Sequence, residues 1–119
     1  MPVEVVVFEG RLPMGDGKGA TMLFAQDFEL AQCGSGARKL TVECEGVQIL
    51  GPAEHQEISS HLVYLDHTLV GRLNADRAEF SLLPAMDAGL HRVRVEVSAF
   101  PGFRFCDDFL LKRILFHCE

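Results

Sequence analysis

Apolar and polar residues alternate with a period of two along most of this 119-residue chain. The alternation is clearest over residues 90–99. One face of this segment is formed by a histidine and three valines, His91, Val93, Val95 and Val97. The opposite face is formed by three charged residues, Arg92, Arg94 and Glu96. Successive side chains of a β-strand point to opposite faces, so this pattern predicts a half-buried strand and not a helix.

The same period predicts strands along the whole chain. We expect them at residues 3–9, 22–30, 38–45, 61–66, 69–73, 78–82, 90–99, 103–106 and 109–118, with a further short strand at 47–50 inside a long loop, 46–60. The turn signal Cys33-Gly34-Ser35-Gly36 predicts that segments 22–30 and 38–45 pair as a hairpin. Segment 109–118 can also be read as a helix. The β pattern before it favours a strand, and Lys112 and Arg113 on opposite faces suit a sheet edge.

Eight or nine short strands separated by frequent turns are typical of a sandwich or barrel. The sequence contains no internal repeat and no linker. We therefore expect a single all-β domain over residues 1–119, a two-sheet antiparallel β-sandwich of jelly-roll or immunoglobulin-like type. If segments 38–45 and 90–99 are neighbours in it, the charged row containing Lys39 and Glu43 should pair with the row containing Arg92 and Arg94.

Composition excludes several classes of protein. The hydrophobic fraction of 48% is too high for a disordered chain, and the formal net charge of −6 lacks the basic footprint of a nucleic-acid binder. The apolar run near the N-terminus, residues 5–8, is too short for a signal peptide or a membrane span. A cytoplasmic address follows by default, or an extracellular one if an export signal has been lost. In the cytoplasm the four cysteines, Cys33, Cys44, Cys106 and Cys118, would stay reduced; a disulfide and a metal site are the alternatives.

Four stretches carry a family resemblance: VYLDHTLVGRL (63–73), AEFSLLPAMDAGLHRVRVEV (78–97), FRFCDDFLLKRI (103–114) and FELAQCGSGARKLTVECEG (28–46). Together they resemble β-sandwich binding modules of the jelly-roll carbohydrate-binding and galactose-binding-like type. Immunoglobulin-like bacterial modules are the second match. The resemblance implies ligand binding through loops at one end of the sandwich.

The sequence also departs from this family pattern. His67 stands where the hairpin glycine is expected, and the chain has no Trp. The one tyrosine, Tyr64, alternates into an apolar strand and is predicted to lie in the core. Because sugar rings stack on exposed aromatic faces, these departures argue against carbohydrate binding. The ligand-binding candidates that remain are Tyr64, His67 and Phe103.

Metal binding has two sets of candidates. The resemblance implies a structural calcium near the closing strand, held by Asp108 with Asp107, and with Glu9 as a conjectured N-terminal partner. A turn with Asp at a cap position is the alternative, and no cofactor is otherwise predicted. For zinc, His61 and His67 lie at opposite ends of one strand, so with His55 they offer a pair at most.

Catalytic patterns are weak. The segment Gly15–Gly19 fails the P-loop spacing, and Glu43 and Glu45 share a solvated strand face. We therefore predict a non-catalytic interaction module that binds a protein partner or self-associates, because sandwich edges suit partner addition. The alternative is carbohydrate or small-ligand binding through loops. The third hypothesis is an enzyme or metal-dependent domain that uses His55, His61, His67 or Asp108.

Overall fold

Eight β-strands make up most of the described part of the chain. The computed structural model describes residues 3–15, 18–31, 37–47, 61–73, 75–82, 87–97 and 109–118. The strands are β1 (Val3–Met14), β2 (Leu23–Leu30), β3 (Arg38–Glu45), β4 (His61–Leu65), β5 (Thr68–Leu73), β6 (Arg77–Leu82), β7 (Gly89–Glu96) and β8 (Phe109–Cys118). These residues contain no helix long and apolar enough to cross a membrane. Every regular element of the described residues is a β-strand, so the all-β prediction is confirmed.

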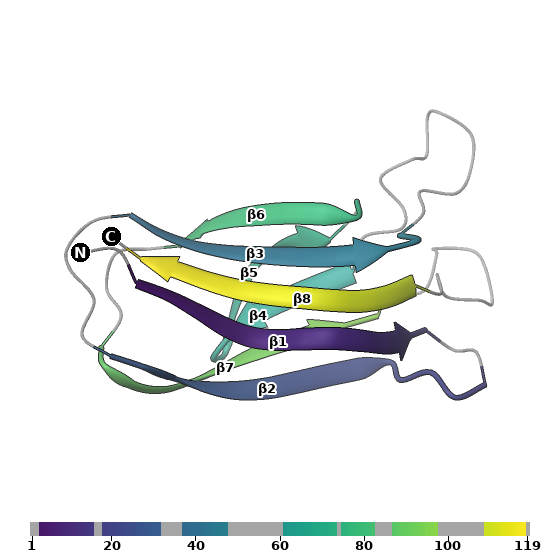
Figure 1. The fold of residues 1–119 in the computed structure, drawn as a ribbon, viewed down its shortest axis with the longest axis horizontal. Helices are drawn as coiled ribbons and strands as arrows, with labels where there is room; N and C mark the ends of the chain where they lie inside the picture. The colour runs from purple at the N-terminus through teal and green to yellow at the C-terminus, as the bar shows by residue number, and fades with distance from the viewer. Residues whose placement is uncertain are drawn as a thin grey trace.

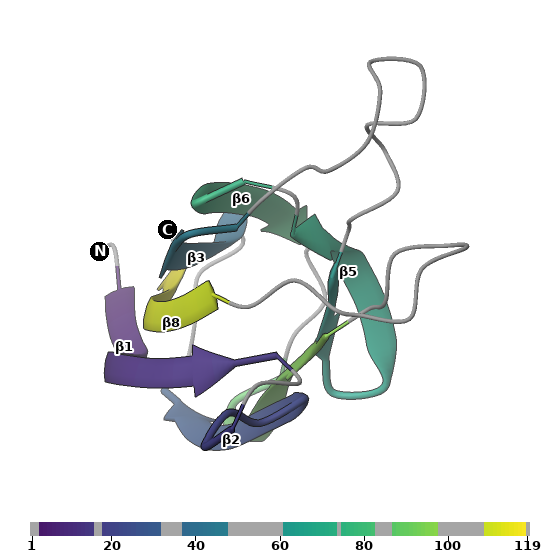
Figure 2. The ribbon, with the colours of Figure 1, turned by 90° about the vertical axis from the view of Figure 1, so that its right-hand side faces the viewer.

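The strands form two four-stranded antiparallel sheets, β1-β8-β3-β6 and β2-β7-β4-β5 (Figure 1). The first strand pairs with the last, the second with the seventh, the third with the sixth and the fourth with the fifth. Such pairing is that of one long antiparallel ribbon wound around a core, which is the jelly-roll arrangement. Seen from its end, the two sheets curve towards each other across that core (Figure 2). The strand order thus selects the jelly roll over the immunoglobulin-like alternative.

The predicted hairpin between segments 22–30 and 38–45 is wrong. β2 pairs with β7 in one sheet, whereas β3 pairs with β8 and β6 in the other. A turn signal reports that the chain reverses, but it does not report whether the two segments stay in the same sheet. In a wound ribbon the partner of each strand is distant in sequence, so the local signal cannot identify it.

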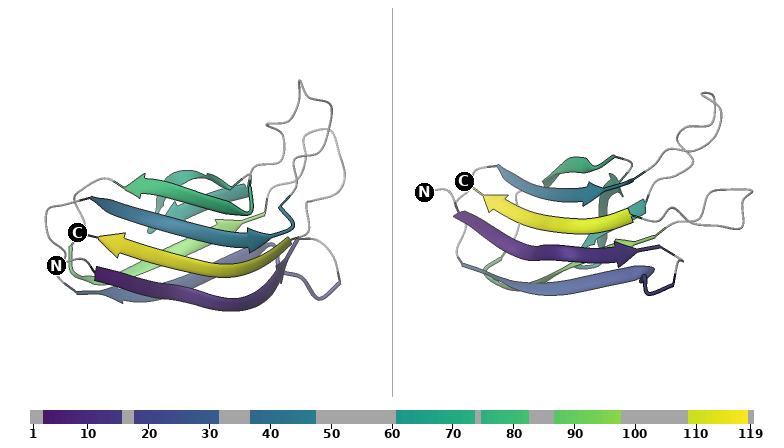
Figure 3. Two further views of the ribbon diagram at one scale, coloured as in Figure 1. Left: turned by 45° about the horizontal axis from the view of Figure 1, so that its top comes forward. Right: turned by 45° about the vertical axis from the view of Figure 1, so that its right-hand side comes forward.

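The prediction that segment 109–118 is a strand is confirmed, but it is not an edge strand. β8 lies between β1 and β3, as both views in Figure 3 show. Its register against β3 shifts by one residue, with Glu43 opposite Arg113 and Cys44 opposite Leu111. This bulge leaves Lys112 without an opposite residue in β3, and extra residues of this kind re-aim side chains. The bulge therefore accommodates two consecutive cations in a central strand.

β1 is longer than predicted. It continues through Gly10 and Pro13 to Met14, where a loop was expected. Its register against β8 shifts between Val6 and Phe8 and again between Glu9 and Leu12. Bulges tolerate glycine, and an edge strand tolerates proline because one side of it has no partner. The turn-like composition of this stretch therefore belongs to an irregular edge strand.

The core lies between the inward faces of the two sheets. Its most deeply buried side chains include Met14, Leu40, Val63, Val93, Ile114 and Phe116. Two aromatic contacts join the sheets at the sides of the sandwich. The ring centroids of Phe8 in β1 and Phe24 in β2 lie 5.0 Å apart, and the ring of Phe80 in β6 packs over Gly71 in β5. The expected alternation of β7 is observed, since Val93 and Val95 are fully buried while Arg92 is exposed.

The expectation that all four cysteines are reduced is wrong. Cys118, the last residue of β8, is disulfide-bonded and fully buried. Cys44 is a buried thiol outside any disulfide. The other two cysteines lie outside the described residues.

The contact between Phe80 and Gly71 generates a prediction about stability. A Cβ at position 71 would lie 2.4 Å from the Phe80 ring, too close to be accommodated without a shift of the ring. We expect Gly71→Ala to lower the free energy of unfolding by about 1–3 kcal/mol, the usual cost of overpacking. Urea unfolding followed by circular dichroism measures this.

Gly10→Ala is the matched control, since its Cβ would meet only Phe8, at 3.4 Å. It should change stability by less than about 1 kcal/mol. Adding Phe80→Leu to Gly71→Ala should recover part of the loss. Equal destabilisation by both alanine variants would contradict the role of the Phe80 contact.

Candidate interaction surface

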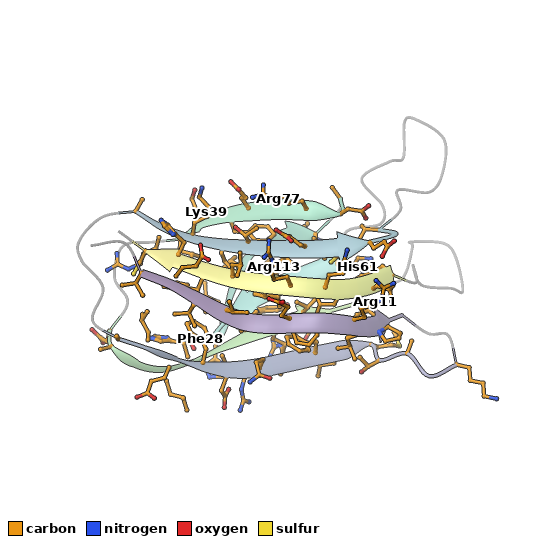
Figure 4. All side chains as sticks on the ribbon, viewed as in Figure 1. Arg11, Phe28, Lys39, His61, Arg77 and Arg113 are labelled. Carbon is orange, nitrogen blue, oxygen red and sulfur yellow. The ribbon has the colours of Figure 1, made fainter. Side chains whose placement is uncertain are left out.

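The outer face of the sheet β1-β8-β3-β6 is covered by paired charges (Figure 4). Arg113 donates two hydrogen bonds to the Glu43 carboxylate, of 2.9 and 3.2 Å. Arg77 lies 2.7 Å from Glu79 and 3.9 Å from Glu43, and Lys39 lies 3.4 Å from Glu79. The hydrogen bonds from Arg113 hold the pKa of Glu43 below its usual value. Charges that neutralise one another within one sheet have little left to offer a partner.

The condition for pairing between the Lys39 row and the Arg92 row, that their strands are neighbours, is not met. β3 and β7 lie in different sheets, so the two rows face opposite sides of the molecule. Arg92 is instead bound by Asp27 of β2, at 2.6 Å from Nε to Oδ1. This hydrogen bond keeps the pKa of the Asp27 carboxyl below its usual value.

The outer face of the other sheet carries apolar and aromatic side chains. In register across it, Arg94 of β7 stands opposite Tyr64 of β4, which stands opposite Leu69 of β5. The neighbouring row holds Leu23, Glu96, Leu62 and Arg72. We call these seven residues the Tyr64 face. Leu23 and Leu69 are about half exposed, at 52% and 46%.

Tyr64 lies at the centre of this face and not in the core, which corrects the expectation from its apolar strand. Its half-buried ring is covered on one side by the Arg94 guanidinium, whose Cζ is 4.3 Å from the ring centroid. Glu96 Oε1 lies 3.1 Å from Arg94 Nε in an ion pair, and the buried Nε makes no hydrogen bond to the described residues. A cation over a tyrosine ring contributes roughly 0.5–1 kcal/mol at an exposed site.

Two side chains fix the turn that ends β4. Asp66 has φ of +58°, a left-handed conformation that Asp tolerates better than most residues. Its carboxylate accepts a 3.0 Å hydrogen bond from the backbone N–H of Arg92, and its other oxygen lies 2.9 Å from His91 Nδ1. The Asp87 carbonyl lies 2.7 Å from His91 Nε2. The turn of the β4–β5 hairpin is thereby tied to β7.

His91 is a structural histidine on the inward face of β7. Its burial alone would lower its pKa, but the hydrogen bonds to the Asp66 side chain and the Asp87 carbonyl outweigh that effect and raise the pKa above 6.5. His67, the adjacent ligand-binding candidate, is exposed in the same turn. Phe103 lies outside the described residues.

The metal candidates are only partly described. Glu9 is exposed on β1 in register with Arg113, which already supplies positive charge beside it. Asp107, Asp108 and His55 lie outside the described residues, so the calcium and zinc hypotheses stay predictions. His61 is fully buried, and its ring centroid lies 4.7 Å from that of Phe109. It is therefore packed against an aromatic ring in the interior and not exposed at the surface. Within the described ranges, no three His, Cys, Asp or Glu side chains are grouped so as to hold a metal ion.

A depression of about 350 Å³ opens at one end of the sandwich. Its described lining is Pro13, Met14, Lys18, Ala20, Glu45, Phe109 and Leu110. Lys18 and Glu45 supply its charged side chains, and Arg11 already lies 3.5 Å from Glu45. A mainly apolar hollow with so few polar groups provides little to orient a ligand.

Reasoning from the sequence missed Leu62, Leu69 and Arg94 as surface groups that act together. One signal could have found them. The strand 61–66 is apolar on both faces, and in a two-layer sandwich the outward face of a central strand borders solvent. An apolar outward row in such a strand marks a surface that can be covered by a partner.

Comparison with known proteins adds the following. The sequence matches no protein-family model and has no significant match among curated proteins. Among solved structures, the fold is similar to the crystal structure of the CBM36-1 domain of a multidomain xylanase from the hindgut metagenome of Trinervitermes trinervoides. The identity is 10%, the TM-score is 0.48, and the match covers 98% of this chain and 96% of that chain. The function is therefore argued from this chain's own surface.

The His91 contacts predict a pH dependence of stability. Because the pKa of His91 is raised in the folded state, its contribution is fully present below pH ~6.5 and is lost as the pH rises through the folded-state pKa. The urea midpoint should therefore fall as the pH rises above ~6.5 and passes through the raised folded-state pKa of His91. His91→Gln should reduce that fall. A fall of the same size in the variant and the parent would contradict the assignment to His91.

Proposed function

We propose that this chain is a non-catalytic interaction module that associates with a second copy of itself through the Tyr64 face. The carrying observation is the row of Arg94, Tyr64 and Leu69 on the outer face of a central strand and its neighbours. Tyrosine and arginine are enriched at the centres of protein interfaces, whereas lysine is depleted. The Tyr64 face contains both enriched residue types and no lysine.

Charge favours a second copy as the occupant. On the described strands of this sheet, the outward charged side chains are three arginines and three acids, Arg72, Arg92, Arg94, Asp27, Glu29 and Glu96. The outer face of the whole sheet is thus neutral, and the Tyr64 face within it carries two arginines and one glutamate, whereas the whole chain carries a formal charge of −6. Two copies that meet at the Tyr64 face therefore do not bring together the acidic charge that the rest of the chain carries. In a two-fold symmetric dimer the same surface of each chain forms the interface. The apolar row of one copy then packs against the apolar row of the other, so the surface needs to be complementary only to itself.

Carbohydrate binding is the second candidate. It is favoured by the placement of the Tyr64 ring at the surface, because sugars stack on such rings and hydrogen-bond to arginine and carboxylate groups. It ranks second because Arg94 already lies over one side of the ring. A sugar would have to displace that guanidinium or bind against the other side.

Sedimentation velocity at protein concentrations from about 10 µM to about 1 mM tests self-association. A tenfold change in the dissociation constant corresponds to about 1.4 kcal/mol of binding free energy. We expect a dimer to form within this range. Leu69→Lys places a positive charge directly opposite Tyr64 and should weaken association at least tenfold. Val6→Lys is the matched control: Val6 is similarly exposed, at 53%, it lies on the opposite sheet, and the change in charge is the same.

A parent chain that stays monomeric over the whole range would refute self-association. Equal weakening by the two lysine variants would remove the Tyr64 face as its site. Retardation of a monomeric parent on gels containing a soluble polysaccharide, abolished by Tyr64→Ala, would establish the carbohydrate candidate instead.

A further inference from the structure

His91 lies between two hydrogen-bond acceptors, and the donors that they require specify its charge. Its Nδ1 is 2.9 Å from a carboxylate oxygen of Asp66, and its Nε2 is 2.7 Å from the backbone carbonyl oxygen of Asp87. An ionised carboxylate and a carbonyl can only accept. A neutral imidazole has one N–H and one bare nitrogen, so it can donate to only one of the two. Both contacts are satisfied together only when the ring carries a proton on each nitrogen.

The surroundings of the ring favour this protonated form. The charged groups that act on it among the described residues are the carboxylates of Asp66, in the β4–β5 turn, and of Asp87, just before β7. From β2 the ring meets only Phe28, whose ring centroid lies 5.8 Å away. Arg92 projects from the opposite face of β7, where a carboxylate of β2 binds it. The neighbours that the structure describes thus stabilise a positive charge on His91.

Loss of the proton breaks one of the two contacts in preference to the other. The bond from Nδ1 to the Asp66 carboxylate is charge-assisted, and such bonds are about twice as strong as neutral ones. The neutral ring therefore keeps its proton on Nδ1. Its bare Nε2 then faces the Asp87 carbonyl oxygen, so two acceptors stand 2.7 Å apart with no proton between them. Deprotonation thus releases the Asp87 carbonyl, while Asp66 keeps its bonds to His91 and to the Arg92 backbone.

A glycine hinge lies between the two ends of this contact. Gly89, the first residue of β7, has φ of +126°, a conformation that residues with a side chain rarely adopt. It stands midway between Asp87 and His91. Leu90, which is 70% exposed, directly follows the hinge. The contact therefore fixes how the chain enters β7 and where an exposed apolar side chain is held.

We propose that His91 and the Asp87 carbonyl form a proton-operated latch at the start of β7. The latch is closed while both ring nitrogens carry protons, and it opens when Nε2 loses its proton. Opening lets the chain move about Gly89 and frees Leu90 from its position on the outer face of the sheet. The latch does not require self-association, because all of its contacts lie within one copy of the chain.

Nitrogen NMR of the histidine rings between about pH 5 and pH 9 tests the protonation. At the acidic end we expect protons on both nitrogens of His91. As the pH rises, Nε2 should lose its proton with a midpoint above ~6.5, while Nδ1 keeps its own. A midpoint below ~6.5, or loss of the proton from Nδ1 instead of Nε2, would overturn the latch.

Amide hydrogen exchange tests the hinge. Gly89 stands opposite Leu30 in an unbroken register between β2 and β7. In the continuation of this register the Val97 N–H donates to the opposite Met22 carbonyl, and hydrogen-bonded pairs alternate along the strands, so the Gly89 N–H donates to Leu30. We expect the protection factor of the Gly89 amide to fall at least about tenfold as His91 loses its proton, with no change in the middle of β7. Constant protection of Gly89 would show that the latch does not open.

Asp66→Asn shifts the latch without removing the residues that form it. Asn keeps an oxygen to accept from the Arg92 N–H and tolerates the left-handed conformation, but it carries no charge. The midpoints of His91 titration and Gly89 exchange should move together to lower pH, because the cation loses a stabilising charge. His67→Gln, in the same turn, is the matched control and should leave both midpoints unchanged. Unchanged midpoints in Asp66→Asn, or equal shifts in the two variants, would exclude this mechanism.

Discussion

The pairing of β1 with β8 is the constraint on which the remaining structure depends. It joins the two ends of the described chain side by side and makes the last strand central to its sheet. Once the ends are paired, the ribbon between them must double back on itself. The pairs β2·β7, β3·β6 and β4·β5 follow in turn. The bulges in β1 and β8 are the local adjustments that let a glycine, a proline and two consecutive cations take part in this long-range pairing.

Winding the ribbon also determines which residues share a surface. Arg94, Tyr64 and Leu69 come from three strands and become neighbours only because β4 lies between β7 and β5. The Asp66 carboxylate helps to hold this arrangement, since it binds both the His91 ring and the Arg92 backbone next to the turn. The same winding brings Glu43 between Arg77 and Arg113 on the opposite sheet. One sheet thus neutralises its own charges, and the other leaves an aromatic and apolar row at the surface.

Period-two alternation made the strands and their buried faces predictable, because it depends only on which face a side chain points to. It could not predict the partner of each strand, which is why the hairpin of 22–30 with 38–45 was wrong. It could not place Tyr64 either, since a strand that is apolar on both faces is consistent with a fully buried position or with an uncovered outer surface. The disulfide at Cys118 was only an alternative in the sequence analysis, because the spacing of cysteines along a chain does not give the distance between them in the fold.

The structure also changes how a partner would bind. Open sheet edges suit the addition of a strand, but both edges of the sheet β1-β8-β3-β6 are protected. β1 is interrupted by two bulges and contains Pro13, and β6 is short and carries Arg77 and Glu79. Such features prevent pairing with another chain. In the sheet that carries the Tyr64 face, β4 pairs with β7 in unbroken register, and the register shift next to Tyr64 lies on the β5 side. Strand addition at an edge of this first sheet is therefore disfavoured, and the proposed association uses the outer face of the second sheet instead.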